Sequence, residues 1–273
     1  MRYFRVILAL SLLVLACSHG ALAKDNGRCD ERLIARIGKH FNFDHFAYPS
    51  DENGGLLVAG ACKHWPSDQV KLITAFAYDS GDSRKVDDPF VYLLIAVIDW
   101  QKTEIVSSYK YKYYLDPGGI KNLKIDTAPY RLSNNVTAFG LDIKSGDSYS
   151  CGDGGTGAER TLYIQDGHQL RPILTLTMSH WSFIEEGSSR CNPASDNADK
   201  EIIENTNLYI GISSSSTKGF KDLLISAIST RNDGKPSNRK PFHSKLRFDG
   251  KEYPTQKLQN EFEKWNQRVI ANK

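Results

Sequence analysis

The sequence predicts a mostly β protein with one short helix near each end. Long runs of β-branched and aromatic residues are separated by Gly, Asp, Asn, Pro and Ser, and helical periodicity occurs only after Asp30 and after Pro254. The chain has 273 residues, of which 40% are hydrophobic and 11% aromatic, enough for a packed core. Two architectures fit this pattern: an antiparallel sandwich or a propeller-like repeat of β units.

The first 23 residues predict a secretory signal. They contain two arginines, an apolar run of 11 residues over Val6–Ala16 that only Ser11 interrupts, and the residues Ala21-Leu22-Ala23, after which cleavage is expected. A membrane-spanning helix needs roughly 20 apolar residues, so no membrane span is predicted. The segment Val14–Cys17 resembles the sequence motif that precedes the lipidated cysteine of bacterial lipoproteins. A lipid anchor at Cys17 is therefore an alternative to cleavage after Ala23, and it is disfavoured.

The remaining residues, 24–273, are expected to form a single domain outside the cytoplasm, periplasmic or secreted. Removal of the signal takes away two of the 35 basic residues and leaves all 32 acidic ones, which gives a net charge of +1. Such a balance creates no strong electrostatic field, so nucleic acid is not an expected partner.

Four cysteines remain in the exported chain, and an even count there favours disulfides. We favour Cys29–Cys62 and Cys151–Cys191 among the three possible pairings, because each encloses a modest loop. Each bridge would contribute about 3–4 kcal/mol by restricting the unfolded chain. The spacings contain no Cys-x-x-Cys or Cys-x-x-His pattern, so neither a metal site nor a cofactor is expected.

Amphipathic patterns predict the two helices. In the first helix Leu33, Ile34, Ile37 and Phe41 fall on one face, and Asp30 can cap its start. In the second helix an apolar stripe follows Pro254 at i, i+4, i+7 and i+11, formed by Leu258, Phe262, Trp265 and Val269. Both stripes are interpreted as core packing.

Nearly everything between the helices is predicted to be strand and turn. The strand runs are QVKLITAFAYD, FVYLLIAVID, TEIVSSYKYKYY, VTAFGLDI, RTLYI, QLRPILTLTM, NLYIGIS, DLLISAIS, SKLRFDG and KEYP. Asp166-Gly167 lies between two apolar runs and strongly predicts a hairpin. The echo of TAFAYDSGDS at 74–83 in TAFGLDIKSGDS at 137–148 suggests an internal duplication around 70–115 and 134–180.

Two segments near the carboxyl end are similar to strand units of secreted bacterial proteins. GFKDLLISA at 219–227 and LRFDGKEY at 246–253 resemble FG-GAP-type repeats, although the Asp-rich calcium loop of those repeats is missing before Gly219. The whole chain also resembles uncharacterised bacterial envelope proteins. These resemblances imply β architecture and bacterial origin, without calcium binding and without catalytic residues.

The stretch SYSCGDGGTGAER, residues 148–160, holds four glycines and two acids beside Cys151. It lacks the lysine and the following helix of a phosphate-binding loop, and it offers too few oxygens for calcium. A glycine-rich turn stapled through Cys151 is the favoured interpretation. Held rigidly at the surface, its Asp153 and Glu159 are candidate binding residues.

Residues 231–257 form a second candidate surface. They contain eight Lys or Arg against three Asp or Glu, with aromatic residues interleaved. Arg239, Lys240 and Phe242 are therefore candidate contacts to an acidic partner surface. Strand edges protected by lysine look similar and are the alternative interpretation.

No arrangement of residues predicts catalysis. Gly-Asp-Ser occurs at residues 81–83 and 146–148, but the Asp-x-x-His that such serine hydrolases require is missing, since Lys240 stands three residues before His243. We therefore expect an exported envelope protein that acts by binding another protein, for example as an inhibitor or immunity protein against a periplasm-targeted toxin. The alternatives are an envelope-directed hydrolase, or a polysaccharide or surface-binding module presenting Trp65, Trp100 and Trp181.

Overall fold

The computed structural model describes residues 29–50, 54–81, 90–115, 119–146, 154–184 and 202–266. Together they form two helices and thirteen strands: α1 (Glu31–His40), β1 (Leu57–Trp65), β2 (Asp68–Tyr78), β3 (Phe90–Asp99), β4 (Glu104–Tyr114), β5 (Ile120–Arg131), β6 (Thr137–Ser145), β7 (Gly154–Thr156), β8 (Glu159–Asp166), β9 (Gln169–Thr177), β10 (Ser179–Phe183), β11 (Ile203–Thr217), β12 (Phe220–Arg231), β13 (Phe242–Leu246) and α2 (Gln256–Asn266). The mostly β class and a helix near each end are confirmed. The predicted signal and Cys17 lie outside the described residues, as do Cys151, Asp153 and Cys191.

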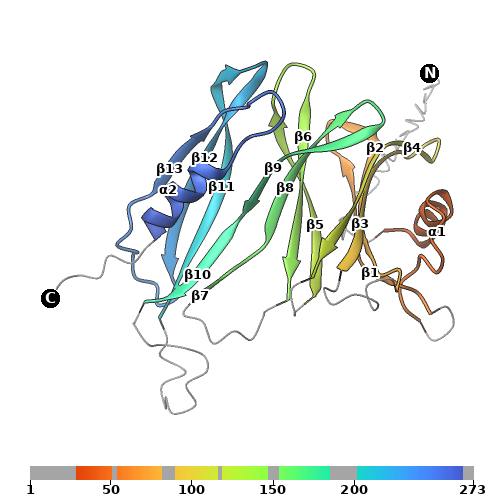
Figure 1. Cartoon of the computed structure of the whole chain (residues 1–273), viewed down its shortest axis with the longest axis horizontal. Coiled ribbons are helices and arrows are strands. Elements are labelled where there is room, and N and C mark those ends of the chain that lie inside the picture. Colours follow the sequence, from red (N-terminus) through yellow and green to blue (C-terminus); the bar gives the residue numbers. More distant parts are fainter. Residues whose placement is uncertain are drawn as a thin grey trace, which may run out of the picture.

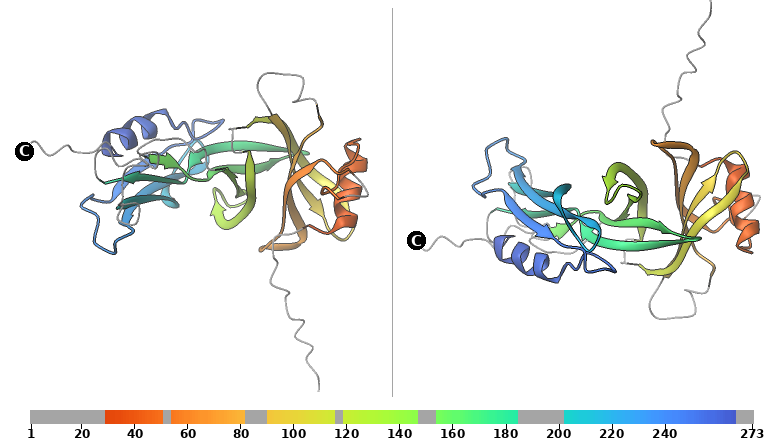
Figure 2. Two further views of the ribbon diagram at one scale, coloured as in Figure 1. Left: turned by 90° about the horizontal axis from the view of Figure 1, so that it is seen from below. Right: turned by 90° about the horizontal axis from the view of Figure 1, so that it is seen from above.

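Eight strands form one large sheet in the order β1-β2-β3-β4-β9-β8-β6-β5. Its strands pair antiparallel except β4 and β9, which pair in parallel through Ser108 and Gln169. The two outer strands, β1 and β5, come together, and Lys63 Nζ donates a hydrogen bond of 3.4 Å to the Ile125 carbonyl. The sheet is thus nearly closed into a barrel, as Figures 1 and 2 show. Neither the sandwich nor the propeller is confirmed.

Alternating side chains fill the inside of this barrel. On β3, Val91, Leu93, Ile95 and Val97 point inward, and they meet side chains from the facing strands such as Phe139. The intervening Leu94, Ala96 and Ile98 point outward and are buried under α1. Burial of both faces explains why β3 reads as a continuous apolar run.

Helix α1 covers the outside of β1, β2 and β3 (Figure 1). Asp30 caps its start as predicted, since its Oδ1 accepts hydrogen bonds from the backbone N–H groups of Arg32 and Leu33 at 2.8 and 3.2 Å. The predicted Cys29–Cys62 disulfide is present and joins the residue before this cap to β1.

A second sheet has the order β13-β12-β11-β10-β7. Its inner face packs against the outside of β5, β6, β8 and β9, where Leu162 and Ile173 meet Leu223 and Ile225. Helix α2 contributes Leu258 and Phe262 to this core, and Figure 1 shows it against the second sheet. Among the described residues, no helix is long and apolar enough to cross a membrane.

The predicted duplication stays a prediction, although the repeated triplets can be placed. Thr-Ala-Phe lies in β2 at 74–76 and in β6 at 137–139. Phe76 points outward under α1, whereas Phe139 points into the barrel. The same three residues therefore occupy opposite faces of the sheet.

Four hairpin turns lie at one end of the barrel, here called the mouth. The β1–β2 and β3–β4 turns share an end because these strands alternate in direction. The β8–β9 turn joins them because β4 and β9 run parallel, and the β5–β6 turn does so because β6 runs antiparallel to β8. The predicted Asp166-Gly167 hairpin is confirmed as the β8–β9 turn, with Gly167 at φ 62°.

Candidate functional site

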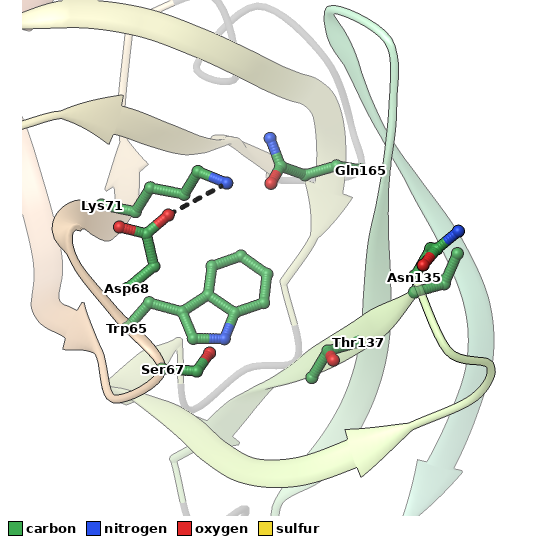
Figure 3. Close-up of a pocket in the computed structure, with 8 residues that line it drawn as sticks. Trp65, Ser67, Asp68, Lys71, Asn135, Thr137 and Gln165 are labelled. Atoms are coloured by element: carbon green, nitrogen blue, oxygen red, sulfur yellow. Dashed lines mark ion pairs between the residues drawn. The ribbon is translucent and has the colours of Figure 1, made fainter.

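A small cavity of about 230 Å³ opens at the mouth of the barrel. Its lining comes from three of the four hairpins, and Figure 3 shows these side chains arranged around a common open space. The mouth pocket is lined by Trp65, Ser67, Asp68, Lys71, Asn135, Val136, Thr137 and Gln165. Most of these side chains are polar, although the barrel below them is apolar.

Trp65 forms the base of the mouth pocket. It ends β1 with its side chain turned inward, where its indole ring meets the Phe139 ring edge-on at 5.6 Å between centroids. Only 8% of the residue is exposed, so little of the indole remains open to a ligand. Packing on Phe139 gives the pocket a rigid apolar base.

One charged pair borders the mouth pocket. Lys71 Nζ lies 3.3 Å from Asp68 Oδ2, and the same ammonium group lies 6.0 Å from the centre of the Trp65 ring. The two side chains are 34% and 41% exposed, so solvent screens the pair and its contribution to stability is small. Both groups can therefore reorient toward a ligand at low cost.

Three other polar side chains of the pocket have no protein partner. Within the described residues, the Asn135 amide and the hydroxyls of Ser67 and Thr137 make no hydrogen bond, whereas Gln165 Nε2 donates to Ser107 Oγ at 3.1 Å. Ser67 and Asn135 are exposed and Thr137 is half-buried, so these groups bond to water when no ligand is present. The pocket thus offers hydrogen-bonding capacity that the protein itself does not use.

The β5–β6 turn holds Asn135 and Thr137 in place. The Leu132 N–H donates to the Val136 carbonyl at 2.9 Å, and the Asn135 N–H donates to Ser133 Oγ at 3.3 Å. Leu132 itself is fully buried, and its carbonyl accepts a 2.8 Å hydrogen bond from the Lys221 N–H of β12. The second sheet therefore anchors this side of the pocket.

The lining of the mouth pocket contains no pair of nucleophile and base. Ser67 is the one hydroxyl beside charged groups, yet no base contacts it, and Asp68 pairs with Lys71. The lining includes neither His nor Cys, and in the described residues no group of His, Cys, Asp and Glu could hold a metal ion. A nucleophile and base at hydrogen-bond distance, which hydrolysis would need, are not among the lining residues.

The structure describes only one of the two acids that were proposed as binding residues in the glycine-rich loop. Asp153 lies outside the described residues. Glu159 begins β8 and lies near the Tyr111 phenol of β4. Burial raises the pKa of Tyr111 far above its ordinary value, and the nearby Glu159 carboxylate raises it further. A binding role for either acid stays a prediction.

The basic candidates near the carboxyl end mostly have partners within the protein. Arg239 Nε lies 2.5 Å from Glu204 Oε2, and its Nη1 donates to the Trp265 carbonyl at 2.8 Å. Phe242 is 7% exposed and packs against Phe262 and Trp265. Lys240, by contrast, lines a cavity of about 430 Å³ together with Glu204, Arg239 and Trp265, and in the described residues its ammonium group has no partner.

The three tryptophans singled out for a surface-binding module differ in exposure. Trp100 is 42% exposed in the β3–β4 turn, edge-on to His64. Trp181 is half-buried over Gly155, where a Cβ atom would come within 2.6 Å of the indole nitrogen. Trp65 alone lines the mouth pocket.

Sequence reasoning missed the polar residues that surround Trp65. Lys71, Asn135, Thr137 and Gln165 are far apart in the chain, and nothing in their local sequence marks them as a group. The sequence feature that could have found them is their position relative to the predicted strands. Each lies within three residues of the end of a predicted strand, which is where hairpin turns gather polar side chains at one end of a barrel.

A separate cluster of charged side chains lies on the outside of the barrel. Arg160 of β8 reaches Asp126 of β5 at 2.5 Å and Asp142 of β6 at 2.5 and 2.8 Å, and Tyr130 bonds both Arg160 and Asp126. Gly140 leaves room for them, because a Cβ there would meet Arg160 and Asp126 at 3.2 Å. Each side chain of the cluster bonds to at least one other member, and Asp126 Oδ1 also accepts from the Ala128 N–H at 2.9 Å, which is typical of a structural role.

The chain was also compared with known proteins. No family model, no curated protein and no solved structure matches it.

Proposed function

We propose that this protein is a binding protein that holds a small, hydroxyl-rich ligand, such as one sugar residue of an envelope polysaccharide, in the mouth pocket. The observation that carries the proposal is the group of unpartnered polar side chains, Ser67, Asn135 and Thr137, around the indole edge of Trp65. Export, predicted from the leader, would bring the pocket into contact with such material.

The size of the cavity favours a small ligand. Pockets for drug-sized molecules measure roughly 300–1,000 Å³, whereas the mouth pocket measures about 230 Å³. At roughly 30 Å³ per water molecule, this volume corresponds to about eight waters. A single sugar ring, or the end of a longer chain, matches this space better than a folded protein segment does.

The lining chemistry favours hydroxyl groups. Hydroxyls both donate and accept hydrogen bonds, and so do the side chains of Asn135, Thr137 and Ser67. A ligand that replaces ordered water must reproduce the water's hydrogen bonds to bind well, and a sugar can do so at several positions at once. The apolar Trp65 edge would contact the C–H groups of such a ring.

Other functions have less support from the described residues. A protein partner, including a toxin bound by an immunity protein, stays a prediction, because Arg239 and Phe242 are engaged inside the molecule. An envelope hydrolase would need a nucleophile beside a base, which the mouth pocket does not provide.

Calorimetric titration with a panel of neutral, acidic and amino sugars and their short oligomers tests the proposal. One class should bind, and Asn135→Ala and Thr137→Val should each weaken it by about fivefold, because each removes one hydrogen bond of about 1 kcal/mol. The matched controls Asn122→Ala and Thr156→Val change exposed residues outside the mouth pocket and should leave affinity unchanged. Equal weakening by the controls, or no binding by any saccharide, would contradict the proposal.

A further inference from the structure

A second cavity, of about 430 Å³, is lined by one end of the second sheet and by Trp265 in the last turn of α2. It is here called the basic pocket. Strand register builds one wall of it, because Glu204 of β11 pairs with Ser182 of β10 on one side and with Arg231 of β12 on the other. Residues paired in this way point to the same face of a sheet, so the three side chains form a row.

The connection from β12 to β13 supplies another wall of the basic pocket. An isolated bridge at Pro236 folds this connection back against β12, and Ser237 Oγ donates a hydrogen bond of 2.6 Å to Glu204 Oε1. At the far end, the Trp265 indole N–H donates to the Lys240 carbonyl at 2.9 Å. The segment from Ser237 to Lys240 is therefore held at both of its ends.

Positive charge predominates in the basic pocket. Its lining includes the cations Arg231, Arg239 and Lys240 and one acid, Glu204. Both carboxylate oxygens of Glu204 already accept hydrogen bonds, and Oε2 does so from Arg239 Nε at 2.5 Å. Asp233 lies outside the lining and pairs with Arg231 at 2.6 Å. Three positive and two negative groups leave a net charge of +1, which one negative charge on a ligand would balance.

The two guanidinium groups are fixed in place but retain unused donors. Arg239 donates to protein acceptors through Nε and Nη1, and Arg231 does so through Nε and Nη2. Within the described residues, Arg239 Nη2, Arg231 Nη1 and the Lys240 ammonium group make no hydrogen bond. The existing ion pairs hold the connection on the sheet, and they also reduce the conformational entropy that the arginines would lose on binding an anion.

We propose that the basic pocket binds a small organic acid that carries one carboxylate and an apolar body. Guanidinium and ammonium groups form strong, charge-assisted hydrogen bonds to carboxylates. The Trp265 ring, whose centre lies 5.4 Å from the Arg239 guanidinium carbon, provides an apolar surface beside these donors. The volume falls within the roughly 300–1,000 Å³ of small-molecule pockets. The basic pocket shares no lining residue with the mouth pocket, so the two sites are separate.

The charge balance favours a carboxylate over a phosphate monoester. A phosphate monoester carries about −1.5 to −2 at pH 7 and would reverse the net charge of the site, whereas one carboxylate neutralises it. The hydrogen bonds that Glu204 and Asp233 accept keep both acids ionised beside the arginines, so their charges remain when a ligand binds.

Titration with benzoate, followed through the Trp265 indole N–H signal in magnetic resonance spectra, tests the proposal. Benzamide has nearly the same shape without the charge, and phenyl phosphate carries a larger charge on the same ring. Benzoate should bind at millimolar concentrations and benzamide about tenfold more weakly, because hydrogen bonds between charged groups are the stronger ones. Phenyl phosphate should bind no more tightly than benzoate.

Two variants locate the anion in the basic pocket. Lys240→Gln should weaken benzoate binding by about fivefold, the upper range for a solvent-exposed ion pair, and Asn238→Asp should weaken it further by adding a carboxylate to the lining. Both side chains are exposed and have no partner in the described residues, so both variants should keep the urea midpoint of the wild type. Lys264→Gln is the matched control, since Lys264 is exposed beside Trp265 but lies outside the lining, and it should bind like the wild type.

Each contrary result overturns a defined part of the proposal. Absence of benzoate binding at tens of millimolar, or equal binding of benzamide, would overturn the anion site. Tighter binding of phenyl phosphate would overturn the assignment to a monocarboxylate. Unchanged affinity in both folded pocket variants, or equal weakening by Lys264→Gln, would show that benzoate binds elsewhere on the protein.

Discussion

Replacing Arg160 by methionine should destabilise the fold through the two carboxylates that the substitution leaves behind. Arg160 lies 2.5 Å from both Asp126 and Asp142, and the side chains of the three residues are only 16%, 19% and 13% exposed. Methionine retains much of the apolar stem and removes the charge. The variant therefore isolates the electrostatic contribution of the guanidinium group.

The expected loss follows from the burial of the cluster. Removing one partner of a buried ion pair costs about 3–5 kcal/mol, because the remaining charge has neither water nor a counter-ion. Some solvent still reaches Asp126 and Asp142, and Tyr130 still donates to Asp126 at 2.7 Å, so the lower end of this range applies. We expect the free energy of unfolding to fall by about 3 kcal/mol at pH 7.

Urea unfolding followed by circular dichroism measures this loss, and Arg171→Met provides a matched control. Arg171 pairs with Asp166 at 3.1 Å, but these side chains are 31% and 64% exposed. Solvent-exposed pairs contribute about 0–1 kcal/mol, so the control should lose far less than Arg160→Met does.

The pH dependence provides a second check on the same variant. Burial alone would raise the pKa of Asp126, but hydrogen bonds from Tyr130 and the Ala128 N–H and the charge of Arg160 together lower it below 3.8. This stabilisation is present above the unfolded-state pKa and is lost as the pH falls through the folded-state pKa. Without Arg160 the Asp126 carboxylate protonates more easily, so the difference between variant and wild type should shrink below about pH 4. A loss under about 1 kcal/mol at pH 7, or a loss independent of pH, would refute the reasoning.

Three further predictions concern the disulfide, a half-buried histidine and a close-packed glycine. Replacing both Cys29 and Cys62 by alanine should lower the free energy of unfolding by about 4 kcal/mol, because the bridge spans 33 residues; equal urea midpoints for variant and wild type would contradict this. Burial lowers the pKa of His180 below 6.5, so stability should be complete above about pH 6.5 and should fall as the pH drops below it. His180→Gln should remove that decline, and an unchanged decline in urea titrations at pH 5 and 7 would assign it to other groups. Gly155→Val should displace the Trp181 indole, whose nitrogen lies 2.6 Å from the position of a Cβ there, and an unaltered tryptophan emission spectrum would contradict the close contact.

Local structure could be predicted from the sequence where local patterns decide it. Asp30 and the apolar stripe behind it predict α1, and Asp166-Gly167 predicts the β8–β9 turn; both were confirmed. The Cys29–Cys62 bridge was also confirmed, since the cap and β1 that it joins lie close together. These features depend on neighbouring residues or on a short loop.

The arrangement of the sheets could not be predicted in the same way. Closure of the barrel depends on the contact between β1 and β5 and on the parallel pairing at Ser108 and Gln169, which join distant segments. The repeated Thr-Ala-Phe shows the difficulty, because Phe76 and Phe139 face opposite sides of the sheet despite identical local sequence. Strand pairing and register, and not residue type, decide where such side chains point.

The candidate site was predictable only in part, for the same reason. Trp65 could be singled out as a tryptophan, but its polar neighbours come together only when three hairpins share one end of the barrel. The composition around Arg239 and Phe242 suggested a binding surface. In the structure, however, Arg239 pairs with Glu204 and Phe242 packs against Phe262 of α2. Composition alone does not distinguish side chains used inside the fold from those left free.

Nuclear magnetic resonance titration of the labelled protein with the best-binding saccharide tests most directly whether the mouth pocket holds the ligand. The indole N–H of Trp65 and the side-chain amides of Asn135 and Gln165 should shift together and saturate with one affinity, because all three line the same cavity. The indole signals of Trp100, Trp181 and Trp265, which lie outside this lining, should stay in place. Shifts confined to those three indoles, with the Trp65 and Asn135 signals unmoved at saturation, would contradict the assignment of the mouth pocket as the binding site.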